Sequence, residues 1–232
     1  MGARMAGWWA AMLLAGTTAT AVAVAGEVDL GSAAGTQASM SVKSWQQIRF
    51  SATVRQQFDF SCGSAALATL LTYHYNYPVT EAVVFEAMFR AGDQQKIRQQ
   101  GFSLLDMQMF LRARGFSGDG FELPLEKLAE AKLPAIVLVS DQGYNHFVVL
   151  KGIADGRVLL GDPSSGARAV SLSRFRELWR NKLLFVIHGY DGAIAFNGAP
   201  DWRTAPTVPL GHAIDTATLA AVTLPKFGPG DF

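Results

Sequence analysis

The spacing of hydrophobic residues changes along the chain, and the change falls near residue 130. Before it, apolar residues recur at helical spacing and predict helices over 63–75, from Thr80, from Ser103 and over 125–132. After it, short branched apolar runs predict strands over 135–140, 146–153, 157–162 and 183–187, with one helix over 171–181. This order predicts an α+β fold, in which an N-terminal helical half packs on a C-terminal antiparallel sheet.

Local signals sharpen several of these elements. The helix over 63–75 is apolar on both flanks, so we expect it to be central and buried, with Asp59 or Ser61 as its cap. Ser103 and Asp106 have the spacing of a capping box, and Gly115 is a stop signal. Alternation within 44–55 predicts one early strand.

The two ends of the chain differ in composition from the middle. Residues 1–25 carry one positive charge, an apolar stretch and a final Ala-Val-Ala, and this pattern predicts a secretory signal peptide; an uncleaved membrane anchor is the alternative. Residues 26–43 are rich in Gly, Ser and Ala and predict a flexible lead-in. The predicted domain occupies 44–188, and residues 189–232 predict an irregular Gly/Pro-rich extension that the site does not need.

Composition and charge exclude several classes of function. Of the 232 residues 17% are charged, the formal net charge is +1, and no Lys/Arg run occurs. The sequence therefore lacks the basic patch that nucleic-acid binding requires. The sequence has no phosphate-binding loop and no metal-ligand spacing, and we expect neither a cofactor nor a metal. With export predicted, the expected location is the periplasm.

The single cysteine is the first candidate for chemistry. Cys62 lies where the sequence starts a helix, and it cannot form a disulfide within the chain. A helix N-terminus favours the thiolate, so we expect a lowered thiol pKa and a nucleophile; a buried core cysteine is the alternative.

A thiol nucleophile needs a base, and His146 is the best placed of the four histidines. It opens a predicted strand after the polar turn "SDQGYN". His74 lies about three turns along the same helix as Cys62, His188 follows the last strand, and His212 is in the extension.

Asp162, at the end of the next strand, is the candidate for orienting His146. A four-residue loop between the strands would place Asp162 opposite Phe147, whereas a tight Asp155-Gly156 turn would place it opposite Val149. Gln56, just before the nucleophile, can donate to an oxyanion together with the Cys62 backbone N–H. Gln57 and Gln46 are nearby alternatives.

Taken together, "RQQFDFSCGSAALATLL", "HFVVLKGI" and "GDP" resemble the C39 peptidases over about 44–187. These are papain-like cysteine peptidases, best known for removing double-glycine leaders. The resemblance implies Cys62 as nucleophile, His146 as base, Asp162 as orienting acid and Gln56 as oxyanion donor. Within the family, the sequence is more similar to stand-alone exported members, including one encoded with functional-amyloid secretion systems.

The resemblance therefore implies an endopeptidase that cuts an exported polypeptide after a small residue, with a secretion-system component as a candidate partner. Gly143 and Tyr144 are expected to shape the cleft. The alternatives are a peptide-binding module without proteolysis and a papain-like cell-wall amidase.

Overall fold

The computed structural model describes residues 26–29, 39–141 and 143–206, which fall in two units divided after Ser44. The predicted signal peptide lies outside the described residues, as do 207–232 of the predicted extension. In the first unit, strands β1 (Gly26–Asp29) and β2 (Ser39–Val42) pair antiparallel. The predicted flexible lead-in over 26–43 includes this pair of strands, because the polar–apolar alternation of Ser39–Val42 favours a strand despite its small residues.

The second unit opens with the helical half. It contains α1 (Trp45–Arg49), α2 (Cys62–His74), α3 (Glu81–Ala91), α4 (Gln94–Gln100) and α5 (Leu104–Arg112). Side-chain caps at Thr80 and Asp93 start α3 and α4, and the predicted capping box of Ser103 and Asp106 starts α5.

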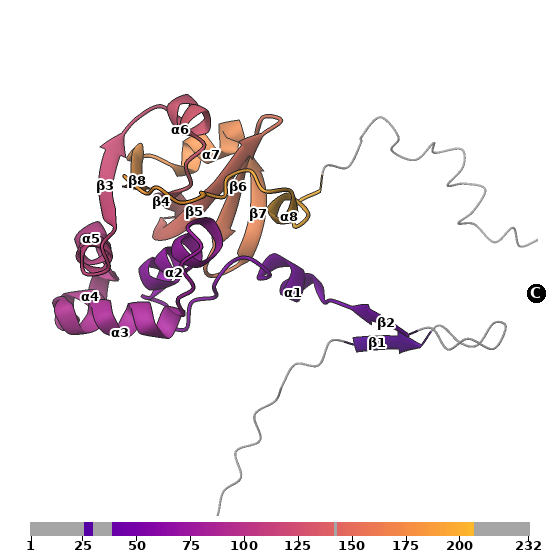
Figure 1. Cartoon of the computed structure of the whole chain (residues 1–232), viewed down its shortest axis with the longest axis horizontal. Coiled ribbons are helices and arrows are strands. Elements are labelled where there is room, and N and C mark those ends of the chain that lie inside the picture. The colour runs from indigo at the N-terminus through magenta and orange to yellow at the C-terminus, as the bar shows by residue number, and fades with distance from the viewer. Residues whose placement is uncertain (1–25, 30–38, 142, 207–232) are drawn as a thin grey trace, which may run out of the picture. The chain divides into compact units, whose positions relative to one another are not determined.

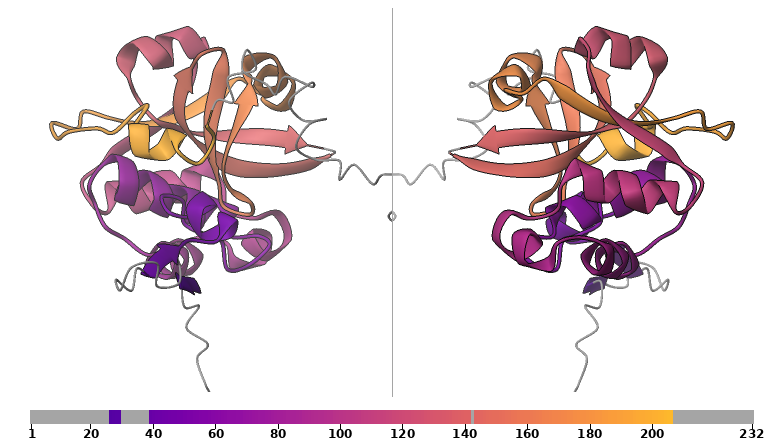
Figure 2. Two further views of the ribbon diagram at one scale, coloured as in Figure 1. Left: turned by 90° about the vertical axis from the view of Figure 1, so that its right-hand side faces the viewer. Right: turned by 90° about the vertical axis from the view of Figure 1, so that its left-hand side faces the viewer.

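A six-stranded antiparallel sheet follows, in the order β3-β8-β4-β5-β6-β7. Its strands are β3 (Ser117–Glu122), β4 (Ala135–Asp141), β5 (Tyr144–Ala154), β6 (Arg157–Asp162), β7 (Gly166–Ser171) and β8 (Leu183–His188). Helices α6 (Leu125–Ala131) and α7 (Leu172–Leu178) lie between strands in the chain. Figures 1 and 2 show the helices α2 to α5 gathered on one side of the sheet.

Two hydrophobic cores cover the two faces of this sheet. Neighbouring strand residues point to opposite faces, so Val149 joins the core made with α2, α3 and α5, while Val148 joins the core made with α6 and α7. As predicted, α2 is central: all of its residues except Thr72 and Tyr73 are buried. Because α2 is held firmly against the sheet, its N-terminus is a rigid platform for Cys62.

Several elements differ from their prediction. Residues 45–49 form α1 instead of the predicted strand, and Arg49 of this helix donates to Ala167 O of β7 (3.3 Å). Helix α4 and strands β3 and β7 were not predicted from the sequence. In "QQKIRQQ" only Ile97 is buried, and the Gly-containing strands lack a branched apolar run, so periodicity gave no signal.

Residues 189–206 contain one short helix, α8 (Ala199–Trp202), and are otherwise irregular, as predicted. They nevertheless pack on the domain: Tyr190 and Ile194 contact the first core, and Phe196 contacts the second. A domain boundary at 188 therefore leaves out residues that contribute to both cores.

Candidate active site

Cys62 is the first residue of α2, at the position that the sequence predicted for a nucleophile. It is largely buried, with 8% of its surface exposed. Backbone hydrogen bonds from Phe147 and Gly63 are directed at its sulfur. Phe147 directly follows His146, so these contacts bring the start of α2 against the start of β5.

His146 and Asp162 meet at that same place. The His146 Nε2 lies 3.2 Å from Asp162 Oδ2, and both side chains are buried. A carboxylate only accepts, so Nε2 carries the proton and Nδ1 is left with its lone pair. The Nδ1 atom is buried without a hydrogen-bond partner, which leaves it able to accept a proton from a thiol.

The register of the β5–β6 hairpin lies between the two registers considered from the sequence. The hairpin has the predicted tight turn, with positive φ at Asp155 (50°) and Gly156 (68°). Pairing runs from Ala154↔Arg157 to Gly152↔Leu159, then shifts by one residue to Leu150↔Leu160 and Val149↔Gly161. Continuing this register sets Asp162 opposite Val148, so both predicted partners, Phe147 and Val149, were wrong by one residue. The cause is a β-bulge at Lys151.

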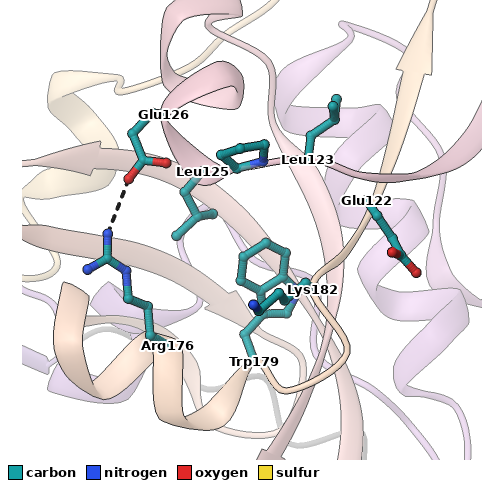
Figure 3. A pocket seen from close by; sticks show the side chains of 8 residues that line it. Glu122, Leu123, Leu125, Glu126, Arg176, Trp179 and Lys182 are labelled. Carbon is teal, nitrogen blue, oxygen red and sulfur yellow. Dashed lines mark hydrogen bonds and ion pairs between the residues drawn. The ribbon is translucent and has the colours of Figure 1, made fainter.

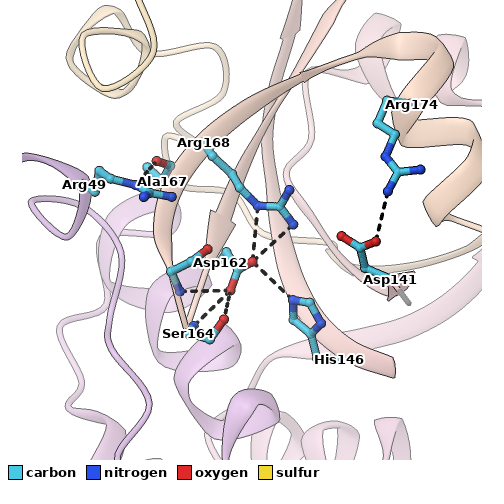
Figure 4. A network of polar contacts seen from close by, with 9 residues as sticks. Arg49, Asp141, His146, Asp162, Ser164, Ala167, Arg168 and Arg174 are labelled. Carbon is cyan, nitrogen blue, oxygen red and sulfur yellow. Dashed lines mark hydrogen bonds and ion pairs between the residues drawn. The ribbon is translucent and has the colours of Figure 1, made fainter. Parts of the chain in front are cut away.

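Asp162 is held by more partners than His146 alone (Figure 4). Its Oδ1 accepts from Ser164 N (2.9 Å), Ser164 Oγ (2.7 Å) and Ser165 N (3.3 Å). Its Oδ2 is also paired with Arg168 of β7, whose Nε and Nη2 both lie 3.3 Å away. The sequence analysis missed Arg168, because β7 itself was not predicted. The carboxylate therefore has a fixed position from which to orient the imidazole.

The electrostatics of the two acids differ in direction. For Asp162, burial alone would raise the pKa, but hydrogen bonds from His146 and Ser164 outweigh burial and hold the pKa well below its usual range. For Cys62, burial raises the thiol pKa, the backbone N–H groups of Phe147 and Gly63 lower it less, and the charge of Asp162 raises it further. The expectation of a lowered thiol pKa from the helix terminus was wrong, because desolvation outweighs the N–H groups.

Gln56 lies in the segment between α1 and α2. Its Nε2 donates to Phe58 O (3.1 Å) and lies 3.5 Å from Asp59 O. Its backbone N–H donates to Pro163 O (3.0 Å), which connects this segment to the residue after Asp162. The structure thus joins Gln56 to the Asp162 loop, while its amide group bonds the turn that leads into α2.

Tyr144 bridges β5 and the segment before α2. Its ring stacks on His146 with centroids 5.4 Å apart, and its hydroxyl donates to Asp59 O (3.2 Å) on the segment before α2. Gly143, with φ of 85°, turns the chain into β5 at this point. Because Tyr144 reaches from β5 to this segment, its ring stays over one face of His146.

Two of the other histidines lie elsewhere in the fold. His74 is buried, and its Nδ1 bonds Ala195 O (2.6 Å), while His188 pairs with Asp119 on the β3–β8 edge (2.6 Å). His212 lies outside the described residues.

A separate hollow of about 580 Å³ is floored by Trp179 and rimmed by two acidic and two basic residues, among them the Glu126–Arg176 pair (Figure 3). None of the four candidate site residues lines it. Trp179 is 5% exposed within the second core, as expected for a packing residue.

Among the described residues, no group of three or more His, Cys, Asp and Glu side chains could hold a metal ion. Within the same part of the chain, every helix is too short or too polar to cross a membrane.

Comparison with known proteins identifies the family. Residues 51–190 match the model of the peptidase C39 family. The chain belongs to the peptidase C39 family. It is 40% identical over 165 residues to a Pseudomonas aeruginosa protein named "Probable functional amyloid protease FapD", covering 71% of this chain and 73% of that relative. A relative of the same name from Pseudomonas fluorescens is 39% identical over 168 residues, covering 72% and 74%.

Among solved structures, the peptidase domain of Streptococcus ComA aligns with a TM-score of 0.49 at 22% identity, covering 58% of this chain and 96% of that domain. The family membership and the two curated relatives make this chain a cysteine peptidase. The α+β arrangement of helices and antiparallel sheet is the papain-like fold of that class, as predicted.

Proposed function

We propose that this chain is an endopeptidase that cuts an exported polypeptide after a small residue, with Cys62 as nucleophile, His146 as base, Asp162 as orienting acid and Gln56 as oxyanion donor. The observation that carries the proposal is the buried His146–Asp162 pair, which leaves His146 Nδ1 without a hydrogen-bond partner. The next residue, Phe147, directs its backbone N–H at the Cys62 sulfur. The Pseudomonas relatives, which are named as probable functional amyloid proteases, support a polypeptide as the substrate.

The reaction begins with a neutral thiol, because burial raises the pKa of Cys62. His146 Nδ1 takes the thiol proton as Sγ attacks the scissile carbonyl carbon, and the carbonyl oxygen becomes an oxyanion. The imidazolium then gives its proton to the leaving amine, the C–N bond breaks and a thioester remains. Water attacks the thioester through the same base, and the proton returns to Sγ as the acid product leaves.

Asp162 serves the step in which His146 is positively charged. Its low pKa keeps it anionic, so it stabilises the imidazolium and keeps the proton on Nε2. For the oxyanion, the first backbone N–H groups of α2 have no partner within the helix and are available as donors. Gln56 would join them by turning its Nε2 from Phe58 O towards the cleft.

A preference for small residues is supported by Tyr144. The Tyr144 ring covers one face of His146, and its hydroxyl donates to Asp59 O on the segment before α2. A bulky side chain next to the cut bond would have to displace this bridge.

The test mixes the purified mature protein with exported polypeptides of its own host and maps new termini by mass spectrometry. We expect termini that follow small residues with wild type and none with Cys62→Ala. Identical termini from both proteins would refute the peptidase proposal. New termini on cell-wall peptides alone would favour the amidase alternative.

A further inference from the structure

The β-bulge at Lys151 puts His146 and Asp162 on the same face of the sheet. On β6, Val158 and Leu160 are two residues apart and both face the second core. On β5, their partners Ile153 and Leu150 are three residues apart and yet face the same core. The extra residue is Lys151. Without it, regular alternation along β5 would turn His146 to the face opposite Ile153 and Asp162, whereas with it His146 shares the face of Val148.

The side chain of Lys151 is fully buried and anchored at its tip. Its Nζ donates to Ala52 O (2.7 Å) and forms an ion pair with Asp201 of α8. Ala52 lies in the segment that continues to Gln56. A buried ammonium group needs such partners, since burial without them is unfavourable.

The C-terminal segment also holds the backbone of the bulge. Asn197 N donates to Lys151 O (3.0 Å), and Asn197 Nδ2 donates to Ile153 O (3.0 Å). The fit is close, because a Cβ at residue 152 would lie 2.2 Å from Asn197 Oδ1 and 3.1 Å from Asn197 Cα, so any larger residue there would have to displace Asn197. Residues 197–201 therefore bind both the side chain of Lys151 and the backbone of the bulge.

We infer that residues 195–204 act as a brace that holds the Lys151 bulge and so keeps Asp162 on the face of His146, with Lys151, Asn197 and Asp201 as positioning residues. This reverses the sequence prediction that the site does not need the extension. The inference rests on the proposed triad, and it adds that the triad depends on a segment after the family match, which ends at residue 190.

Alkylation of Cys62 by iodoacetamide tests the brace without any peptide substrate, because the chain has one cysteine. The rate constant is measured from pH 5 to 9 in the full mature chain. In the proposed triad His146 takes the proton of the buried thiol and Asp162 orients His146, so Asp162→Asn and His146→Ala should each slow the reaction near neutral pH. Asp201→Ala, Gly152→Ala and Asn197→Gly should slow it by about tenfold and give a similar pH profile.

A double-mutant cycle separates positioning from a general structural effect. If the brace acts through Asp162, Asn197→Gly should have no further effect on the rate in the Asp162→Asn background, whereas independent defects would multiply. The matched control is Glu126→Gln, which breaks an exposed ion pair at the Trp179 hollow and should keep the wild-type profile.

The outcomes are distinct. A folded Asn197→Gly protein with the wild-type profile overturns the brace, while Asp162→Asn and His146→Ala still support the triad. If His146→Ala itself leaves the profile unchanged, the proposed triad is wrong, and the inference is wrong with it. Asn197→Gly decides the matter if Asp201→Ala does not fold, because Asn197 is exposed and its φ of 57° suits glycine.

Discussion

At the scale of single residues, the thiol of Cys62 depends on a neighbour for its reactivity. Burial raises its pKa, and in the proposed triad the thiolate forms as His146 takes the proton. We expect alkylation by iodoacetamide to be fast at neutral pH in wild type and to require a higher pH in His146→Ala. His188→Ala should match wild type, because His188 pairs with Asp119 at a different edge. Equal profiles for all three proteins would instead make Cys62 a buried core cysteine.

Gln56 offers a second test at this scale. If its amide donates to the oxyanion, Gln56→Ala should lower turnover by about 10- to 1000-fold and leave alkylation of Cys62 nearly unchanged. Gln57→Ala is the control, since it changes an exposed neighbour of the same type. A parallel fall in turnover and alkylation would mean that Gln56 acts by holding the turn at Phe58 and Asp59.

Tyr144 should set the size of the residue before the cut bond. Tyr144→Ala removes both the ring over His146 and the bridge to Asp59 O, so peptides with Val or Leu at that place should gain relative to Gly. Tyr144→Phe loses only the hydroxyl and should keep most of the preference. The measurement is kcat/KM across peptides that differ at this residue. An unchanged order of peptides with Tyr144→Ala would exclude Tyr144 from specificity.

At the scale of elements, the sequence predicted those with strong local signals. Helix α5 has a capping box and α2 a dense apolar run, and both lie within one residue of their expected start. Strands β3 and β7 were missed, because their Gly-containing sequences become strands through pairing with distant partners. Because β7 was not predicted, Arg168 was not recognised as a partner of Asp162. Asp162 was predicted, but its pairing on β5 was not, because the bulge at Lys151 shifts the register in a way that local pattern does not show.

The C-terminal end of α2 should make stability pH-dependent. Burial, followed by the charge of Lys151, lowers the pKa of His74 to about 4, and its Nε2 is buried without a partner. An unfolded chain binds this proton near pH 6.5, so stability is full above that value and falls as the pH drops towards 4. The contribution lost is about 3 kcal/mol at most.

Denaturant unfolding at pH 7 and pH 4.5 measures this loss. In His74→Asn the difference in unfolding free energy between the two pH values should shrink by most of that amount. His188→Gln should keep it, since His188 is exposed. A wild-type loss that persists in His74→Asn would assign the acid sensitivity to other groups.

At the scale of the whole molecule, the catalytic domain ends later than its sequence pattern indicates. In the described part of the chain, the contacts that reach the sheet from the C-terminal segment extend to Ala205, whose carbonyl accepts from Arg157 Nη1 (3.0 Å). A chain ended at Pro206 keeps all of these contacts, and we expect its Cys62 alkylation profile to match that of the full chain.

A chain ended at His188 lacks Asp201, the partner of the fully buried Lys151. This loss should cost about 3–5 kcal/mol of unfolding free energy and lower the Tm. Adding Lys151→Met to the shorter chain removes the unpaired charge and should restore part of the stability, but not the alkylation profile, because the bulge still lacks Asn197. If the chain ended at His188 alkylates Cys62 as the full chain does, the site is complete without the segment, and residues 189–206 serve only to cover the two cores.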